Sequence, residues 1–236
     1  MDSSTKLKLF STPAHTCSYL PEKQATTIFV DPLAKIDKNL YSRLSLAGFR
    51  RSGAQIYRPY CKTCTACIPV RIPVNRFSDK RKHRRTRKAN ESLIVTKHRP
   101  KFTQEYFSLY EKYITERHSD GDMYPPSPSQ FKSFLVDARP ETSFYEFRES
   151  GQLLAIAVAD EIENGLSAIY TFFDTCVSNK ALGVFAILWL VDEARKQKLE
   201  FLYLGYWIKE SPKMNYKSEY KPIEFYVNNK WSEIER

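Results

Sequence analysis

Apolar residues in the first half of the chain recur at two different spacings. Between residues 31 and 49 they return every three or four positions, which predicts a helix over this range with Gly48 as its stop. A short strand is predicted directly afterwards, over residues 49–57. The stricter alternation of isoleucine and valine over residues 68–74 predicts a second strand. Residues 1–14 show no period and are predicted to form an extended entry segment.

The rest of the chain is predicted to combine helices with a run of strands. Helices are expected over residues 80–89, 103–118, 129–136 and 182–196. Strands are expected over residues 92–97, 142–148, 153–161, 166–173 and 201–206. Three consecutive strands, a helix and one further strand indicate an α+β fold. Acyltransferases that use acetyl-coenzyme A share this element order, although many unrelated folds contain it.

The composition is that of a globular protein. Of 236 residues, 42% are hydrophobic and 27% are charged, which excludes wholesale disorder and supplies enough apolar mass for a core. The longest apolar stretches, such as residues 182–191, fall short of the roughly 18 residues needed to cross a bilayer. Residues 1–9 contain no apolar segment ahead of a small-residue cleavage site. We therefore expect a cytoplasmic protein with no membrane partner.

Positive charge is concentrated in one segment. The chain has a formal net charge of +10, and residues 76–101 contain eleven lysines and arginines against two acidic residues. A local excess of this kind is typical of a protein that binds a polyanion, most simply a nucleic acid. A solvated helix face is the alternative, since charge runs often have no partner. The cations expected to meet nucleic acid on the predicted basic helix are Lys80, Arg81, Arg84, Arg85 and Lys88.

Three of the five cysteines form the run Cys61-x-x-Cys64-x-x-Cys67. Two-residue spacing lets neighbouring thiolates face one metal ion, and tetrahedral zinc needs a fourth ligand. Cys17 is the natural fourth donor, with His15 as a substitute. Zinc or an iron–sulfur cluster is therefore a candidate cofactor. Reduced structural cysteines in a tight loop are the alternative.

The motifs of common covalent and phosphate-binding enzymes are missing from the sequence. It contains no Ser-His-Asp order of the kind used by hydrolases, no GxxxxGK loop and no HExxH pair. The four histidines lie in polar or basic surroundings and form no obvious constellation. If the chain is an enzyme, we expect it to work by positioning its substrates rather than through a catalytic triad.

Two long segments resemble the signatures of one protein family. Residues 48–77, GFRRSGAQIYRPYCKTCTACIPVRIPVNRF, are similar to the N-terminal signature of arginyl-tRNA–protein transferases. Residues 203–225, YLGYWIKESPKMNYKSEYKPIEF, are similar to the second signature of that family. Shorter matches are GLSAIYTFFD at 165–174, ALGVFAIL at 181–188 and CSYLPEKQA at 17–25. The resemblance covers nearly the whole chain, in order and with matching gaps.

The resemblance implies an aminoacyltransferase that moves an amino acid from an aminoacyl-tRNA to the N-terminal aspartate or glutamate of a protein, which marks that protein for N-degron degradation. The short chain resembles the bacterial branch, which takes leucine from leucyl-tRNA. Arginyl transfer is one alternative, and a non-catalytic RNA-binding module with a zinc knuckle is the other. The transfer from an activated ester to an amine requires no cofactor.

The family also implies a domain plan. An acetyltransferase-like (GNAT-type) core is expected over residues 101–236, and a smaller α+β part with the cysteines and the basic run over residues 1–100. Eukaryotic members carry a second cysteine where this chain has Leu20. The set left for a metal in this chain is Cys17, Cys61, Cys64 and Cys67.

The implied chemistry asks for three kinds of site residue. Tyr170, Asp174 and Tyr206, at or near the ends of the central predicted strands, are candidates for oxyanion stabilisation or proton transfer. Trp207 is a candidate for stacking on the terminal adenosine of tRNA, with a core role as the alternative. The carboxylate of the acceptor needs a cation. The cations inside the two signatures are Arg50, Arg51, Lys213 and Lys217.

Overall fold

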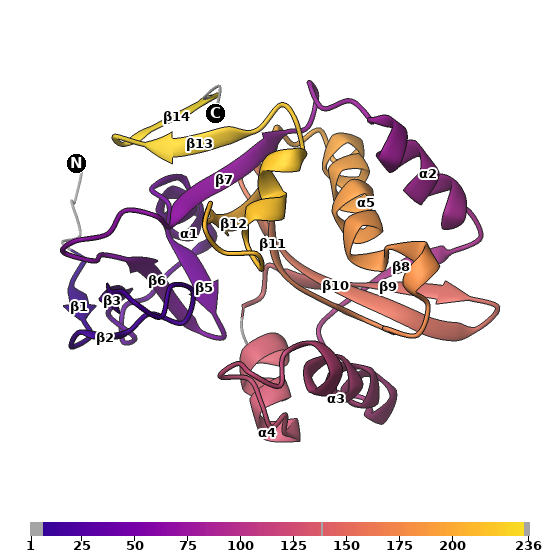
Figure 1. Cartoon of the computed structure of the whole chain (residues 1–236), viewed down its shortest axis with the longest axis horizontal. Helices are drawn as coiled ribbons and strands as arrows, with labels where there is room; N and C mark the ends of the chain where they lie inside the picture. The colour runs from indigo at the N-terminus through magenta and orange to yellow at the C-terminus, as the bar shows by residue number, and fades with distance from the viewer. Residues whose placement is uncertain (1–6, 138, 234–236) are drawn as a thin grey trace.

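A mixed sheet of eight strands runs through the computed structural model, which describes residues 7–137 and 139–233 (Figure 1). From one edge to the other its strands are β14 (Lys230–Glu233), β13 (Glu224–Val227), β7 (Ile68–Pro73), β12 (Phe201–Trp207), β11 (Gly165–Phe173), β10 (Gln152–Ile162), β9 (Thr142–Glu149) and β8 (Ile94–His98). The pairing of β11 with β12 is parallel, and the other described pairings of this sheet are antiparallel. The α+β class predicted from the sequence is confirmed.

A smaller sheet from the N-terminal part lies beside the central sheet. Its strands are, in order, β1 (Leu9–Ser11), β4 (Thr27–Val30), β6 (Gln55–Pro59) and β5 (Arg50–Ser52), with a ribbon of β2 (His15–Thr16) and β3 (Gln24–Ala25) next to it. Helix α1 (Lys38–Leu46) follows β4 in the chain. The Asp37 side chain accepts a hydrogen bond from the backbone N–H of Leu40 and so caps the helix.

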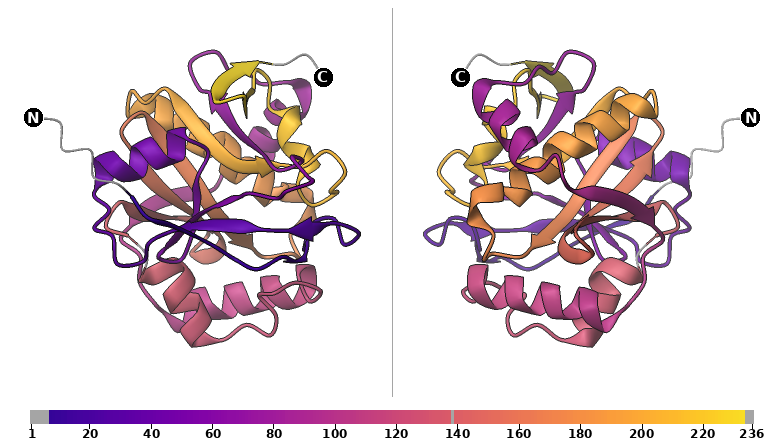
Figure 2. Two further views of the ribbon diagram at one scale, coloured as in Figure 1. Left: turned by 90° about the vertical axis from the view of Figure 1, so that its left-hand side faces the viewer. Right: turned by 90° about the vertical axis from the view of Figure 1, so that its right-hand side faces the viewer.

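Helices cover both faces of the central sheet (Figures 1 and 2). One face carries α5 (Leu182–Lys196) and α2 (Arg81–Ala89), and the other carries α3 (Gln104–Arg117), α4 (Pro128–Phe131) and the π-helical turn η1 (Lys132–Val136). Because side chains alternate along a strand, β10 contributes to two cores. Ala155 and Ala157 pack in the cluster that contains α5, whereas Ile156 and Val158 pack with α3. No described helix is both long and apolar enough to cross a bilayer.

Strands β11 and β12 pair only at their beginnings and then separate. Their parallel register ends at Ser167 opposite Tyr203, and no pairing is described beyond it. Gly205 marks the change in β12, because its φ is +79° and the register of β12 with β7 shifts between Tyr203 and Gly205. We call the separated segments, residues 168–173 of β11 and 204–207 of β12, the fork.

Several elements differ from their sequence-based predictions. The helix predicted over residues 31–49 begins only at Lys38, because the Asp37 cap fixes its start. The single strand predicted over residues 49–57 is the hairpin β5–β6, which turns at Gly53 with a φ of +57°. The boundary predicted at residue 100 runs through the central sheet, because β7 and β8 precede it and pair with β12 and β9.

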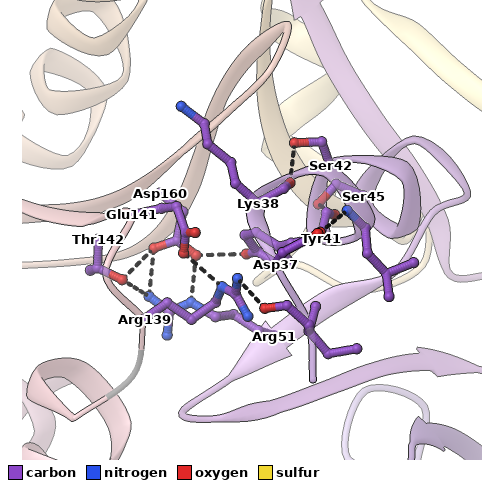
Figure 3. Close-up of polar contacts among 12 residues, drawn as sticks. Asp37, Lys38, Tyr41, Ser42, Ser45, Arg51, Arg139, Glu141, Thr142 and Asp160 are labelled. Carbon is purple, nitrogen blue, oxygen red and sulfur yellow. Dashed lines mark hydrogen bonds and ion pairs between the residues drawn. The ribbon is translucent and has the colours of Figure 1, made fainter. Parts of the chain in front are cut away.

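A buried ion pair joins the two sheets (Figure 3). Arg51 on β5 donates from Nε and Nη2 to the carboxylate of Asp160 on β10, over 2.5 and 2.7 Å, and neither side chain is exposed. Tyr41 and Thr142 donate to the same carboxylate over 2.6 and 2.7 Å. Burial raises the pKa of Asp160, but the hydrogen bonds and the charge of Arg51 outweigh it and hold this pKa below its usual range. The pair is therefore charged and fully hydrogen-bonded.

We predict that Arg51→Met destabilises the fold by about 3–5 kcal/mol, because it leaves the Asp160 carboxylate buried without its counter-charge. Lys38→Met is the control. It breaks the ion pair between Lys38 and Glu161, whose side chains are 44% and 39% exposed, respectively. Exposed pairs contribute about 0–1 kcal/mol. Chemical denaturation measures both losses, and similar losses in the two variants would contradict the importance of the buried pair.

Candidate functional site

Arg50 reaches from the small sheet into the fork. Its Nη1 donates to Ser167 Oγ over 2.6 Å, and its Nη2 donates to the main-chain oxygen of Ala168. Ala168 is the first residue of β11 beyond the pairing with β12, and a carbonyl outside a ladder needs another donor. A Cβ atom at Gly205 would lie 3.2 Å from Arg50 Nε. The glycine therefore leaves room for the guanidinium group between the separated strands.

Lys217 is a buried amine whose protonation the charge of Arg50 disfavours. It belongs to the 3₁₀ helix η3 (Asn215–Glu219) and is only 6% exposed. Its Nζ donates to the main-chain oxygen of Tyr206 over 2.7 Å and contacts Met214 Sδ at 3.2 Å. Burial and the charge of Arg50 lower the pKa of Lys217 to about 7. The fork thus combines a permanent cation with an amine that titrates near neutral pH.

Two tyrosines of the fork differ in how their hydroxyl groups are used. The Tyr206 hydroxyl donates to the main-chain oxygen of Gly48 over 2.9 Å, so it links the fork to the small sheet. The Tyr170 hydroxyl is buried and has no hydrogen-bond partner among the described residues, and its ring packs edge-on against Tyr113 and Phe134. Of the two, Tyr170 is the one whose hydroxyl has no partner among the described residues.

Asp174 follows β11 and is already paired. Lys112 Nζ lies 2.7 Å from its Oδ1, and the backbone N–H of Cys176 donates to the same oxygen over 3.0 Å. Burial raises the pKa of Asp174, but the hydrogen bonds from Lys112 and Cys176 outweigh it and hold this pKa below its usual range. The carboxylate is therefore a weak base, and its surroundings favour a structural ion pair.

Three other predicted site residues have side chains that are engaged by other groups. Arg51 directs its donors to Asp160, as described above. Lys213 is on the surface, 2.7 Å from Asp120, and its side chain is 54% exposed. Trp207 is only 5% exposed, and its Nε1 donates to the main-chain oxygen of Asn215 over 2.9 Å. The stacking role considered for Trp207 is therefore wrong, because its indole is packed in the core.

The four predicted metal ligands influence one another electrostatically. Burial, together with the charges of Cys17, Cys61 and Cys64, raises the pKa of Cys67 to about 12. Among the described residues, no group of three or more His, Cys, Asp and Glu side chains is arranged to hold a metal ion. We therefore derive no step through a metal, and zinc or iron at these cysteines stays a prediction.

Helix α2 presents the basic run to solvent. Its Arg87 pairs with Asp79 and Asp192, and its His83 is buried between the rings of Phe77 and Tyr220. The opposite side is exposed and has no ion-pair partner among the described carboxylates. The residues on that side are Arg81, Arg84, Arg85 and Lys88.

The same helix contacts η3, which carries Lys217. Lys82 forms an ion pair with Glu219, and Lys80 Nζ donates to the main-chain oxygen of Glu219 over 2.9 Å. The predicted nucleic-acid surface and the fork are therefore neighbours.

Two hollows in the surface lie away from the fork. The larger, of about 670 Å³, is lined mainly by apolar residues from β4, from residues 31–36 and from the β5–β6 turn. The smaller, of about 500 Å³, is lined by charged residues that include Lys38, Lys97 and Glu161. Neither contains a residue of the fork. We place the candidate site at the fork, because it unites a buried amine, a guanidinium group and an unpartnered hydroxyl.

Sequence reasoning missed two residues that shape the fork. Ser167 is a small polar residue near the start of a largely apolar strand, and Gly205 interrupts the apolar run of residues 201–208. A glycine inside a strand pattern often marks a bulge or a close approach of another group. That signal was present at Gly205, but the sequence does not show that Arg50 is the group that approaches.

The chain matches one family at both ends. The family described as "Arginine-tRNA-protein transferase, N terminus" matches residues 15–85, and "Arginine-tRNA-protein transferase, C terminus" matches residues 105–227. The chain is 52% identical to an aspartate/glutamate leucyltransferase of Pseudomonas fluorescens (strain SBW25), over 98% of both chains. It is 54% identical to those of Pseudomonas putida (strain GB-1) and Pseudomonas aeruginosa (strain LESB58), again over 98% of both chains.

Among solved structures, the chain is similar to L-PGS from Bacillus licheniformis, with a TM-score of 0.45 and 10% identity. That likeness covers 60% of this chain and 45% of that chain.

We predict that Gly205→Ala costs more stability than Gly151→Ala. Both glycines have positive φ, +79° and +85°, so alanine is strained at either position. A Cβ at Gly151 would meet nothing within 4 Å, whereas at Gly205 it forces Arg50 to move. Losing a hydrogen bond from a charged donor adds about 1.5–3 kcal/mol. Denaturation midpoints measure the difference, and equal losses would show that Arg50 shifts without leaving Ser167.

Proposed function

We propose that this chain, which belongs to the arginine-tRNA–protein transferase family, transfers leucine from leucyl-tRNA to the N-terminal aspartate or glutamate of proteins and so marks them for N-degron degradation. The observation that carries this proposal is the identity of 52% and 54% to aspartate/glutamate leucyltransferases over 98% of each chain. The family name refers to arginine, so the choice of leucine follows these relatives. The chain is accordingly an aminoacyltransferase.

The proposal includes an acetyltransferase-like core in the C-terminal part. The order β9, β10, β11, α5 and β12, with one parallel pairing that opens into the fork, supports it. Separated strands leave main-chain donors and acceptors outside the ladder. We propose that the leucyl ester binds at these groups, where donors can face a developing oxyanion.

The reaction needs positioning more than covalent help. An α-amine has an ordinary pKa of about 7.7–8.0, so much of it is neutral near pH 7 and can attack the ester. Holding the amine and the ester together supplies about 7–11 kcal/mol of the barrier. The protein then has to stabilise an oxyanion and move one proton. The Tyr170 hydroxyl is the proposed donor to the oxyanion, because Tyr206 and Asp174 are engaged by other groups.

Arg50 is the proposed partner of the acceptor carboxylate. A carboxylate that enters a partly dry site loses hydration, and a fixed cation offsets that loss. Arg50 is held in the fork by two hydrogen bonds, to Ser167 and Ala168, which leaves its other N–H groups for a substrate. Arg51 is engaged by Asp160, and Lys213 lies on the surface.

We propose that tRNA binds across α2. The exposed cations Arg81, Arg84, Arg85 and Lys88 can contact phosphates, and Lys80 at the start of the helix can join them. The contacts of Lys82 and Lys80 with Glu219 support this proposal, because η3 also carries Lys217. We propose that the reaction takes place in the cytoplasm, where charged tRNA is available.

We predict a mass increment of one leucine on a peptide that starts with Asp when the protein is incubated with a mixed pool of charged tRNAs. Mass spectrometry reads the product, and a matched peptide that starts with Asn is the control and should gain little. An arginine increment would assign the chain to arginyl transfer. No increment from any charged tRNA would leave only a binding role.

We predict that reversing Arg81, Arg84 and Arg85 to Glu weakens tRNA binding at least tenfold while the thermal unfolding temperature stays close to that of the wild type. Each phosphate that the variant no longer neutralises also reduces the slope of log affinity against log salt by about 1. The control is Lys62→Glu, an exposed change in the cysteine loop. Binding assays at several salt concentrations provide the measurement, and unchanged affinity and slope would place the tRNA on another surface.

A further inference from the structure

Lys217 is a buried amine with no acidic partner among the described residues. Its Nζ has two polar contacts, the main-chain oxygen of Tyr206 at 2.7 Å and Met214 Sδ at 3.2 Å. Burying an ammonium ion is costly unless a carboxylate pairs with it. A carbonyl oxygen and a thioether do not supply that negative charge. The site is therefore built for a lysine that is neutral for much of the time.

The titratable groups around Nζ favour the neutral amine. Arg50 approaches from β5, and its positive charge repels an ammonium ion. Cys67, from the segment before β7, favours the ammonium ion when it is a thiolate. Tyr216 on η3 places its ring 5.5 Å from Nζ and has a raised pKa, and Tyr206 offers its carbonyl. Lys217 is left with a pKa of about 7.

The amine also lies at the edge of the fork. Tyr206, whose carbonyl holds Nζ, comes three residues after Tyr203, the last residue of β12 that pairs with β11. It directly follows Gly205, the residue that makes room for Arg50. A leucyl ester held between the separated strands would therefore lie near the carbonyl that holds Nζ.

On the basis of the proposed leucyl transfer, we propose that Lys217 is the proton acceptor of that reaction and a catalytic residue of the fork. The lone pair of the neutral α-amine forms the C–N bond to the leucyl carbonyl carbon. Neutral Nζ removes one proton from the nitrogen, which has become positive. The ester C–O bond then breaks, its electron pair goes to the ribose oxygen of tRNA, and Nζ returns the proton to that oxygen. Lys217 ends neutral, and no other reactant is consumed.

A role in binding the acceptor carboxylate, which the sequence suggested for Lys217, makes a different prediction. A carboxylate needs a charged partner, and an arginine would serve there as well as a lysine. A proton acceptor has to be neutral, and arginine stays protonated at any pH used for the assay. The variants Lys217→Arg and Lys217→Met therefore separate the two roles.

We expect both Lys217→Met and Lys217→Arg to lower kcat by about 100-fold or more, the usual range for a lost acid–base group. The KM for an Asp-starting peptide and the affinity for tRNA should change less than threefold. Lys209→Met is the control, because Lys209 is an exposed lysine shortly after β12, and it should keep wild-type kinetics. Thermal unfolding of each variant checks that the fold is retained.

The pH profile gives a second readout. With saturating acceptor peptide, the wild-type kcat should fall as the pH decreases through about 7, because protonated Lys217 cannot accept a proton. In Lys217→Met this dependence should disappear, which leaves only the titration of the acceptor amine. A wild-type profile identical to that of Lys217→Met would overturn the proposal.

Chemical rescue keeps the test valid even if one variant folds poorly. Activity of Lys217→Ala should increase with the free-base concentration of added methylamine, and guanidinium ion at the same concentration should not restore it. Equal rescue by guanidinium, or wild-type kcat in Lys217→Arg, would show that Lys217 acts as a cation and overturn the proposal. A wild-type protein that transfers no amino acid would instead overturn the proposed function, so the two failures are distinguishable.

Discussion

The ion pair between Arg51 and Asp160 holds the small sheet against the central sheet, and the contents of the fork depend on that attachment. Arg51 on β5 binds Asp160 on β10, and its neighbour Arg50 binds Ser167 on β11. Asp160 and Ser167 are opposite each other in the β10–β11 ladder, so the two arginines are held by adjacent positions of the central sheet. The guanidinium group of Arg50 then donates to the carbonyl of Ala168, which the separation of β11 and β12 leaves outside the ladder. The stabilising contact of Arg51 thus helps to position the guanidinium group of the preceding residue, Arg50.

Two buried titratable side chains, Asp160 and Lys217, have opposite environments. Asp160 receives hydrogen bonds from Arg51, Tyr41 and Thr142, so its charge is compensated and its pKa is lowered. Lys217 receives no such compensation, and its pKa is lowered because the charged form is disfavoured. The first arrangement supports the fold, since both partners are charged at every physiological pH. The second leaves a group free to change its protonation state, which is the property that acid–base chemistry requires.

The sequence predicts an element correctly where its local residue pattern alone determines the structure. Helix α5 has the predicted bounds, residues 182–196, because its apolar pattern is long and uninterrupted. The hairpin at Gly53 differs from the single predicted strand, since the glycine between Ser52 and Ala54 has no proline or asparagine beside it to strengthen the turn signal. Lys213 and Lys217 looked equivalent, yet one is paired with Asp120 on the surface and the other is buried. Burial of a single lysine in a short 3₁₀ turn depends on long-range packing that residue spacing does not encode.

The hairpin β5–β6 places a limit on how its sequence can vary. Side chains at its surface-facing positions can change without affecting either arginine, because the strands are held by main-chain hydrogen bonds. A change in length is different. One residue inserted or deleted in the turn between Ser52 and Gln55 would shift β5 against β6 by one position and reverse the faces of Arg50 and Arg51, which would remove both from Ser167 and Asp160. The hairpin can therefore tolerate substitutions but not a change in length. Relatives with the same fork should have a hairpin of the same length.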